Sequence, residues 1–490
     1  METKEKIGHW WACCSLFALG CFAFAPTVQF DFVNWDDPAY VWHNELIRSW
    51  SPGNLYGVAT ESVTRNYAPL TILSLLIDHT LWGMEAGGYH ATNVILHALN
   101  GVLVYLLVRQ LTQSGFIAWS TAALFLVHPI QIETVAWISS RKGLLSGTLI
   151  LAALIVRLRP GARAGEDGWY IGLLAAALLS KALAVVVPPI VLLYDIWVRR
   201  DRFSDAIVRQ VIPGLLSLLL MLHTMGAQNA ILGGVRGHME LSLPEIMAVD
   251  ITILCRYLRM LVYPNDLCVL YDPPTTGILG AVLAGAAAWG IGLIIVWKSR
   301  HTHPLWIWGV SSFLLLLFPV LNFFRITTLM NDRYLYLPCI VVFAMIAAGV
   351  SRVMQLVGQA VSSFSARIFS APTHSAPTLS KQVPMILSGA CCLCALLASL
   401  SATNNYLPVW RNSDSLWAHA MQHVPQLSVV RIQLALTLHD SGRTSEAVQV
   451  LAKARQECAA DTQDQNRMDE AIRKWNQELA QATRRNPDFR

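Results

Sequence analysis

Charged residues are scarce in this sequence. Asp, Glu, Lys and Arg make up 14% of its 490 residues, against about 25% in a typical soluble domain. Apolar residues make up 54%, and they gather in runs of roughly 17–25 residues, the length that crosses a bilayer. This composition excludes an ordinary soluble protein and predicts an all-α, polytopic membrane protein. The net charge of +5 carries no sign of a nucleic-acid partner, because the positions of the positive residues in a membrane protein matter more than their sum.

Other signals are also missing. The ten cysteines form no CxxC pair and no Cys/His spacing typical of zinc, and most lie in apolar runs, where cysteine behaves as a small hydrophobe. No Asn-x-Ser/Thr sequon occurs, which favours a bacterial protein. The first 25 residues resemble a signal peptide, but an uncleaved first helix suits a polytopic chain better.

The apolar runs predict about 11 transmembrane helices. They lie near 9–28, 91–110, 115–129, 143–158, 168–180, 181–198, 211–226, 277–297, 304–321, 336–354 and 384–403. Lys and Arg are in excess at 157–167, 198–203, 297–301 and 352–381, so we expect these loops in the cytoplasm. The expected location is the bacterial inner membrane, with the N-terminus cytoplasmic and the C-terminus periplasmic. Whether 245–263, which contains Asp250, Arg256 and Arg259, crosses the membrane stays open.

Two domains follow from this division. Residues 1–403 form the predicted transmembrane domain, and its first periplasmic loop, 29–90, is long and rich in aromatic residues. Residues 404–490 form a predicted periplasmic helical domain, in which "LALTLHDSGRTSEAVQVLAKA" has the small and large positions of a tetratricopeptide repeat (TPR). This short tail is either a structural cap or a surface that docks a protein partner.

Paired carboxylates stand in the first periplasmic loop. "FVNWDDPAYV" places Asp36 and Asp37 directly before a proline. Alone, this is good turn chemistry. However, basic residues also stand near the outward ends of apolar segments, where the distribution of charge in membrane proteins disfavours them. They are Arg141, Lys142, Lys181, Arg325 and Arg333.

This combination of charges suits sugar transfer from a lipid-phosphate donor. An aspartate would take the proton from an acceptor hydroxyl, and the cations would stabilise the leaving phosphate. Asp36 and Asp37 could instead hold a divalent cation, Mg²⁺ or Mn²⁺. His128 and Glu133 in "LVHPIQIETVAWISSRK" are either further site residues or an ordinary polar cluster at a helix end.

Seven segments occur in the order found in one family. They are "FVNWDDPAYV", "YAPLTILSLLIDHTLWG", "YHATNVILHALNGVLVYLL", "LVHPIQIETVAWISSRK", "LLSKALAVVVPPIVLLYDIW", "FPVLNFF" and "NDRYLYLP". The chain resembles the polytopic membrane glycosyltransferases of the GT-C class that carry C-terminal TPRs, which include the transmembrane and tetratricopeptide-repeat O-mannosyltransferases.

The resemblance implies a reaction and a site. The reaction would be an inverting transfer from a polyprenyl-phosphate sugar to a protein or glycan hydroxyl on the periplasmic side. Asp36 or Asp37 would be the base, and Arg333 would lie near the donor phosphate. The other positions matched by the motifs are His128, Glu133, Arg141, Lys142 and Tyr336.

Two other functions remain open. A transporter or flippase for a polyprenyl-linked glycan would use the same cations without a base, although no internal symmetry typical of transporters is visible. A non-catalytic scaffold would dock partners through the TPR-like tail.

Overall fold

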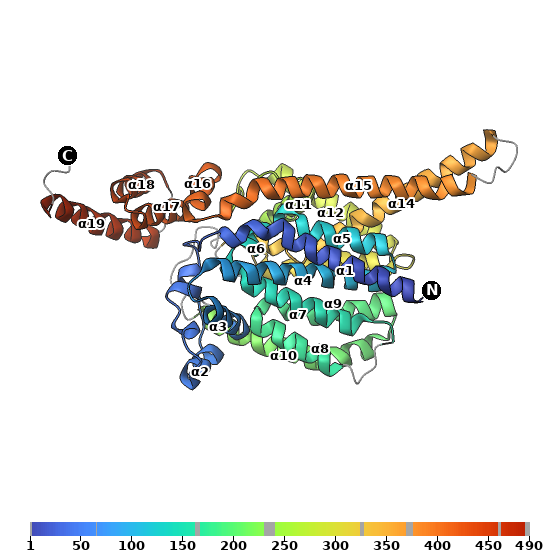
Figure 1. Ribbon diagram of the computed structural model, residues 1–490, viewed down its shortest axis with the longest axis horizontal. Helices are drawn as coiled ribbons and strands as arrows, with labels where there is room; N and C mark the ends of the chain where they lie inside the picture. Colours follow the sequence, from blue (N-terminus) through green and yellow to red (C-terminus); the bar gives the residue numbers. More distant parts are fainter. Residues whose placement is uncertain are drawn as a thin grey trace.

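The chain is helical throughout the part that the computed structural model describes, apart from turns, loops and one isolated bridge between Val63 and Asn66. The described residues are 2–64, 66–161, 167–229, 241–323, 328–368, 376–458 and 462–485. The helices form one large bundle, with the C-terminal helices projecting from one end (Figure 1). The predicted all-α class is confirmed.

The bundle consists of long helices and shorter ones that pack between them. Its long helices are α1 (Glu2–Phe24), α4 (Ala86–Thr112), α10 (Phe203–Asn229), α11 (Leu243–Val262), α12 (Leu279–Lys298), α14 (Cys339–Ile368) and α15 (Ala376–Tyr406). Its shorter helices are α5 (Gly115–Val127), α7 (Arg141–Leu158), α8 (Asp167–Ser180), α9 (Val187–Tyr194) and α13 (Pro304–Leu317).

Fewer helices qualify as membrane spans than the 11 expected. Among the described residues, seven helices are long and apolar enough, or eight if the pair α5 and Pro129–Ala136, bent by 56°, counts as one span. The remaining predicted spans correspond to α7, which carries three basic residues, and to α8 and α13, which have 14 residues each. Helix α11 is not among the candidate spans. The protein is thus a multi-pass membrane protein whose bundle also contains shorter helices.

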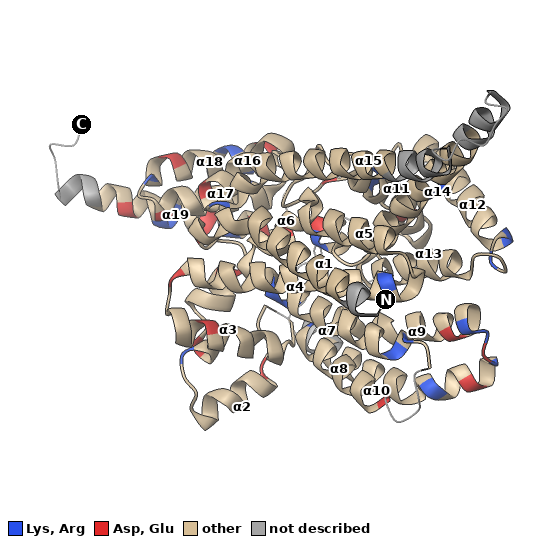
Figure 2. Cartoon of the chain, turned by 45° about the vertical axis from the view of Figure 1, so that its right-hand side comes forward, with Lys and Arg blue, Asp and Glu red and all other residues tan. Residues whose placement is uncertain are grey.

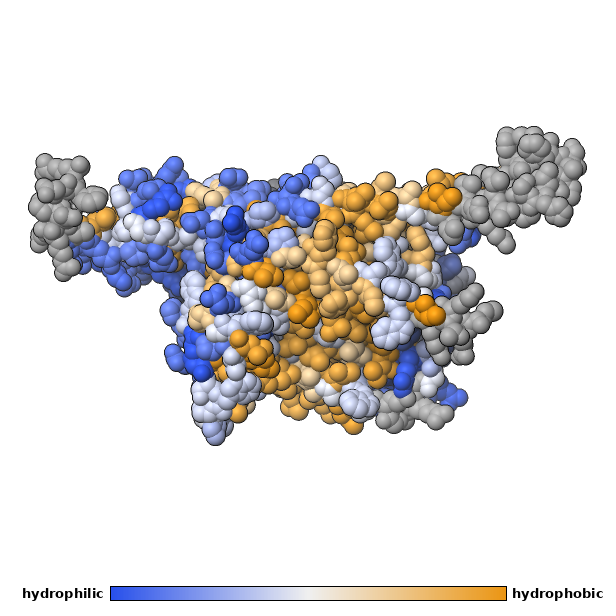
Figure 3. All heavy atoms as spheres, viewed as in Figure 1, coloured by the Kyte–Doolittle hydropathy of each residue, from blue (hydrophilic) through white to orange (hydrophobic). Residues whose placement is uncertain are grey.

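The surface has the distribution that a bilayer requires. Apolar side chains form a broad zone across the middle of the bundle, with polar regions at both ends (Figure 3). Large apolar side chains of α10 and α12, such as Leu219 and Leu283, are more than 60% exposed. Charged residues gather at the ends of the bundle and along the C-terminal helices (Figure 2). Such an exposed apolar zone would be costly in water and is favourable in lipid.

The loop 29–90 that is predicted to be periplasmic, called here the first outward loop, folds into a small unit of its own. It contains η2 (Pro38–Trp42), η3 (Glu45–Ile47), α2 (Pro52–Thr60) and α3 (Pro69–Trp82). A separate apolar cluster that includes Tyr40, Ile47 and Leu75 holds these short elements together. Burial of this cluster gives the loop a defined shape, so its aspartates occupy fixed positions.

A proline and short helices shape the segment opposite this loop. Pro129 ends α5, since the residue before a proline is driven out of the helical region. The chain then passes through η4 (Pro129–Gln131), α6 (Ile132–Ala136) and η5 (Ile138–Ser140) before α7. These turns bring Glu133, Trp137 and Lys142 to the end of the bundle that carries the first outward loop.

The tail begins without a break after α15. It consists of η12 (Leu407–Trp410), α16 (Ser413–His423), α17 (Ser428–Asp440), α18 (Thr444–Glu457) and α19 (Thr462–Arg485). Helix α16 contributes Leu416 and Trp417 to the main core, whereas α17, α18 and α19 share a separate core around Leu451 and Trp475.

Candidate active site

The two aspartates of the first outward loop have different surroundings. Asp37 is 1% exposed. Its Oδ2 accepts a hydrogen bond from the Val33 amide at 2.9 Å, and its Oδ1 accepts from the amide and hydroxyl of Ser139 at 3.0 and 2.5 Å. The Asp36 side chain is 30% exposed, and its Oδ2 lies 3.7 Å from Nζ of Lys142. Asp36 is therefore the carboxylate that a substrate can reach.

Titration and geometry favour different aspartates. Burial raises the pKa of Asp37 from 3.8 to about 6, while hydrogen bonds from Ser139 and Val33 oppose the rise. A carboxyl group with such a pKa suits general-base chemistry. However, both Asp37 oxygens are already engaged by the protein, so geometry favours Asp36 as the group that contacts an acceptor.

Lys142 lies beside Asp36 at the start of α7. Its ammonium group donates a hydrogen bond to the Tyr40 hydroxyl at 3.2 Å. It also lies 4.7 Å from the centre of the Tyr40 ring and 5.8 Å from that of Trp137. The Lys142 side chain is 13% exposed. Aromatic faces and one carboxylate hold this cation in place while leaving part of it accessible.

Arg333, from a distant part of the sequence, contacts the same tryptophan, Trp137. Its guanidinium lies 5.3 Å from the centre of the Trp137 ring and 5.2 Å from that of Tyr334. It forms an ion pair with the fully buried Glu133, which also accepts a hydrogen bond from the Arg333 amide at 2.9 Å. Glu133 therefore anchors Arg333, and the indole of Trp137 lies against two cations.

Lys181 adds a third cation to this group. It follows α8 in extended backbone, directly before η7 (Ala182–Val186). Its Nζ lies 3.7 Å from the point that a Cβ on Gly143 would occupy, at the start of α7. The charges that act on Lys181 are those of Lys142, Arg333 and Glu133. We call Asp36, Lys142, Lys181, Arg333 and Glu133 the charged cluster; its three cations face two carboxylates.

Three predicted site residues have their partners inside the protein instead. Arg141 is fully buried and binds Oδ2 of Asp78 at 2.6 Å, as well as the Tyr89 carbonyl and the Asn93 side chain. The structure therefore places Arg141 in a buried ion pair between helices, although the sequence predicted it near the donor phosphate.

His128 and Tyr336 are also internal. Nδ1 of His128 accepts a hydrogen bond from the Ile130 amide at 3.2 Å and so caps η4. The Tyr336 hydroxyl lies 3.0 Å from Nδ1 of His97 and accepts from Nδ2 of Asn100 at 2.9 Å. Both are at most 4% exposed, so these two predicted substrate-binding residues make their contacts inside the protein.

The structure adds residues that the sequence analysis did not single out. Tyr40 and Trp137 hold the cations, and Ser139 holds Asp37. All three stand inside motifs already quoted, so the motifs were the available signal. Their roles depend on contacts between segments about 100 to 200 residues apart, which no local pattern shows.

The tail holds the loop that carries Asp36. Asn34 donates through its amide to the Ser413 hydroxyl at 2.9 Å and through Nδ2 to the Thr437 hydroxyl at 2.9 Å. Nε1 of Trp417 donates back to Oδ1 of Asn34 at 2.5 Å, and Trp35 packs edge-on against Trp417. Helices α16 and α17 thus fix the residues directly before the aspartate pair.

The aspartate pair is poorly arranged for a divalent cation. Both Asp37 oxygens accept hydrogen bonds, and the nearest cation to Asp36 is an ammonium group. Within the described ranges, neither residue falls in a group of three or more metal-ligating side chains. Asp36 and Asp37, as arranged here, therefore do not fit Mg²⁺ or Mn²⁺.

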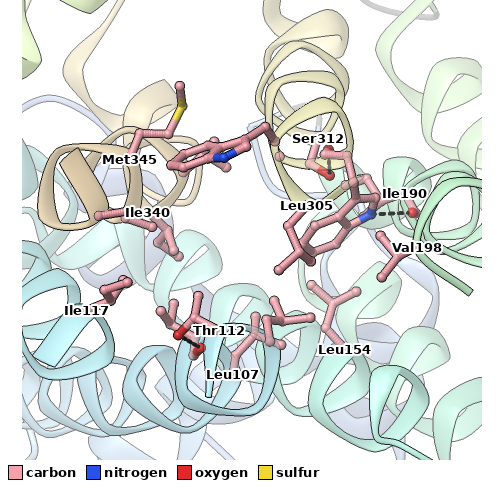
Figure 4. A pocket seen from close by; sticks show the side chains of 18 of the residues that line it. Leu107, Thr112, Ile117, Leu154, Ile190, Val198, Leu305, Ser312, Ile340 and Met345 are labelled. Atoms are coloured by element: carbon pink, nitrogen blue, oxygen red, sulfur yellow. Dashed lines mark hydrogen bonds between the residues drawn. The ribbon is translucent and has the colours of Figure 1, made fainter. Parts of the chain in front are cut away.

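An apolar cavity of about 480 Å³ lies within the bundle. Figure 4 shows Leu305 and Ile340 on one side and Leu107 and Leu154 on the other. The Trp308 indole in its wall donates to the Ile190 carbonyl at 2.9 Å. The cavity runs from Thr112 and His303, at the end predicted to be cytoplasmic, to Leu337, four residues after Arg333.

Comparison with known proteins gives relatives in sequence, although no protein-family model matches the chain. It is 28% identical over 226 residues to protein O-mannosyl-transferase TMTC1 of Mus musculus, covering 41% of this chain and 24% of that protein. It is 32% identical over 180 residues to Tmtc1 of Drosophila melanogaster, covering 36% and 19%. It is 27% identical over 201 residues to protein O-mannosyl-transferase F38B6.6 of Caenorhabditis elegans, covering 39% of this chain and 29% of that protein. The matched region thus spans less than a third of each relative.

Two solved structures of ArnT from Cupriavidus metallidurans also align with the chain. The one bound to undecaprenyl phosphate is 13% identical, with a TM-score of 0.38, covering 94% of this chain and 82% of that one. The apo structure is 12% identical, with a TM-score of 0.40, covering 93% and 80%. At these TM-scores the alignments do not establish a common fold. The sequence comparisons do confirm the resemblance read from the motifs: over about two fifths of its length, this chain is similar to the TMTC protein O-mannosyltransferases.

Proposed function

We propose that this protein is a membrane glycosyltransferase. It transfers a sugar from a polyprenyl-phosphate donor to a hydroxyl of a protein or glycan on the periplasmic face of the bacterial inner membrane, with inversion at the anomeric carbon. One observation carries the proposal: the accessible Asp36 lies beside Lys142, in a cluster that also contains Arg333 and Lys181. A carboxylate base next to several cations is what this reaction requires.

Asp36 is the proposed base. Its carboxylate takes the proton of the acceptor hydroxyl while that oxygen attacks the anomeric carbon. The bond from this carbon to the phosphate oxygen breaks on the opposite face of the sugar, which inverts the configuration. The polyprenyl phosphate leaves with the bonding electrons. Asp37 keeps the turn in place through its hydrogen bonds to Val33 and Ser139.

The cations are the proposed phosphate site. Lys142 and Arg333 lie against the Trp137 ring, and Lys181 adds charge from the residue that follows α8. As the phosphate oxygen separates from the sugar, it gains negative charge, which fixed cations in a water-poor site stabilise strongly. Binding of phosphate by Lys142 would also draw this lysine away from Asp36 and leave the carboxylate freer to accept a proton.

The apolar cavity is the proposed site for part of the prenyl chain. Its lining is almost entirely apolar, and it extends into the bundle from Leu337. Each methylene that leaves water for such a site contributes about 0.8 kcal/mol. This arrangement would hold the lipid in the membrane and its phosphate at the charged cluster.

The test is turnover by the purified full-length protein. A panel of polyprenyl-phosphate sugars is supplied with candidate acceptors, with and without a divalent cation, and released polyprenyl phosphate is measured. Asp36→Asn is expected to lower turnover by about 10²–10⁴-fold with donor binding retained. The matched control is Asp31→Asn, an exposed aspartate of the same loop.

The possible results distinguish the glycosyltransferase from the flippase and the scaffold. Full turnover in Asp36→Asn would refute this residue as the base. Loss in Asp37→Asn alone would transfer the role to Asp37. Transport of a lipid-linked glycan that survives both substitutions would favour the flippase. Absence of donor binding, together with a protein partner lost on removal of 427–490, would favour the scaffold.

A further inference from the structure

A cysteine and two histidines from distant parts of the chain meet outside the charged cluster. Cys268 lies in the loop between α11 and α12, and His419 and His423 lie on α16. One ligand atom from each of these three residues lies within 4.8 Å of the others. This is the one group of three or more possible metal ligands found in the described part of the chain. It lies where the membrane domain meets the tail.

The arrangement has the chemistry of a zinc site. His419 and His423 are four residues apart, so they project from the same face of α16. Cysteine thiolate and histidine nitrogen are both preferred ligands of Zn²⁺, with bonds of about 2.3 Å to sulfur and 2.0 Å to nitrogen. Ligands of one tetrahedral ion are separated by less than 4.8 Å, so small side-chain rotations would complete the geometry.

The surroundings favour metal binding over simple packing. Nδ1 of His423 lies 3.0 Å from the His419 carbonyl, which can only accept, so this nitrogen donates and Nε2 keeps its lone pair. A hollow of about 190 Å³ lined by Cys268, Asp272 and His423 adjoins the group. It leaves room for a water molecule or the Asp272 carboxylate as fourth ligand.

We propose that Cys268, His419 and His423 form a structural zinc site that joins the loop after α11 to helix α16. On binding, the Cys268 thiol loses its proton to solvent and the thiolate coordinates the ion. The inference goes beyond the proposed function and does not depend on it.

The position explains what such an ion would stabilise. Tyr271, in the same loop as Cys268, donates a hydrogen bond to Asp332, the neighbour of Arg333. Helix α16 holds the segment before Asp36 through Trp417. A zinc ion would therefore connect the loop that contacts the neighbour of Arg333 with the helix that holds the segment before Asp36.

The experiment measures metal bound to the full-length protein in detergent. After removal of metal by a chelator, Zn²⁺ is added and the bound zinc is counted by elemental analysis; Co²⁺ is used as a spectroscopic probe. We expect one zinc ion per chain. Cobalt should give the visible absorption of a tetrahedral site and a thiolate-to-cobalt charge-transfer band.

Substitutions identify the ligands. Cys268→Ser should remove the charge-transfer band, and His423→Gln should lower zinc affinity by at least tenfold while the protein stays folded, since this side chain is exposed. The controls Cys458→Ser and His43→Gln, in the tail and the first loop, should leave binding unchanged. No stoichiometric zinc in the wild type, or equal binding in Cys268→Ser and His423→Gln, would overturn the proposal.

Discussion

At the scale of single residues, burial separates two neighbouring aspartates. The sequence left open whether Asp36 or Asp37 is the base, because neighbours in a turn look alike. In the structure, Asp37 is buried under Ser139 and Val33, while Asp36 remains accessible beside Lys142. A buried carboxylate with satisfied hydrogen bonds is suited to holding a turn, and an accessible one to meeting a substrate.

The raised pKa of Asp37 predicts a pH-dependent stability. The pKa of Asp37 is about 6 in the folded protein, above its ordinary value of 3.8. Protonated Asp37 therefore stabilises the folded state, and this stabilisation is fully present below about pH 4. It is lost as the pH rises through about 6; at about 1.4 kcal/mol per pKa unit, the free energy of unfolding falls by about 3 kcal/mol. We expect Asp37→Asn, which cannot ionise, to gain thermal stability relative to the wild type over this interval.

The measurement is the melting temperature of both proteins between pH 4 and 8 in the same detergent. Asp31→Asn, an exposed neighbour in the loop, serves as the control and should follow the wild type. A constant difference between Asp37→Asn and the wild type across this range would contradict the assignment of the pKa to burial.

Arg141 and Asp78 form a pair whose role can be tested. The pair is buried, so removing one partner leaves an uncompensated charge that costs about 3–5 kcal/mol. We therefore expect Arg141→Met to destabilise the protein strongly and the double variant Arg141→Met/Asp78→Leu to recover most of the stability.

Activity of the double variant decides between two functions of Arg141. If the arginine only supports the bundle, turnover should recover together with thermal stability. If Arg141 binds the donor phosphate, as the sequence predicted, the double variant should be stable but poorly active. Parallel melting and turnover measurements on the single and double variants distinguish these results.

At the scale of elements, α16 links the tail to the active-site loop. Trp417→Phe removes the hydrogen bond from Nε1 to Asn34 and keeps most of the ring packing. The expected loss of stability is about 1 kcal/mol, with faster amide hydrogen exchange in residues 31–37 and lower turnover. Trp475→Phe is the matched control, because Trp475 lies in the separate core of α17, α18 and α19. Equal exchange in both variants would show that α16 does not hold the loop.

This contact bears on the alternatives that the sequence left open for the tail. The hydrogen bonds of Asn34 to Ser413 and Thr437 favour a structural support for α16 and α17. Docking of a protein partner remains a prediction for α18 and α19, which lie farther from the membrane domain.

Some elements could be predicted from sequence and others could not. Apolar runs located the long helices, because the bilayer demands long apolar segments. The same runs could not distinguish spans from α8 and α13, since a short apolar helix buried in a bundle has the same composition. The sequence also could not show how α7 accommodates its charges: Arg141 and Arg157 on this helix form ion pairs with Asp78 and Asp195 from other helices.

The sequence predicted several residues of the candidate site but not the contacts between them. Asp36, Lys142 and Arg333 came from ordered motifs, and the structure brings them together. The pairing of Arg333 with Glu133 joins residues 200 positions apart, and only the tertiary fold decides it. The proposed zinc ligands His419 and His423 have their third partner, Cys268, about 150 residues away in the sequence, so no Cys/His spacing typical of zinc points to them.

At the scale of the whole molecule, the proposed function requires the apolar cavity and the charged cluster to hold two parts of one lipid. The cluster lies at the end of the bundle expected to face the periplasm, and the cavity extends from Leu337 toward Thr112 at the opposite end. A lipid whose phosphate binds the cations would pass its chain along α13 and α14. The length of the prenyl chain should then matter for binding.

Filling the cavity tests this arrangement. Ala344 lines the cavity, so Ala344→Trp should occupy space needed by the lipid chain. We expect the KM for a long-chain polyprenyl-phosphate sugar to rise at least tenfold, while kcat and the KM for a short-chain analogue change little, because the charged cluster is untouched. Leu283→Trp, which adds the same ring to an exposed, lipid-facing position of α12, is the control for bulk alone. An equal effect on long and short donors would mean that the cavity does not hold the chain, and that the substitution acts on the bundle as a whole.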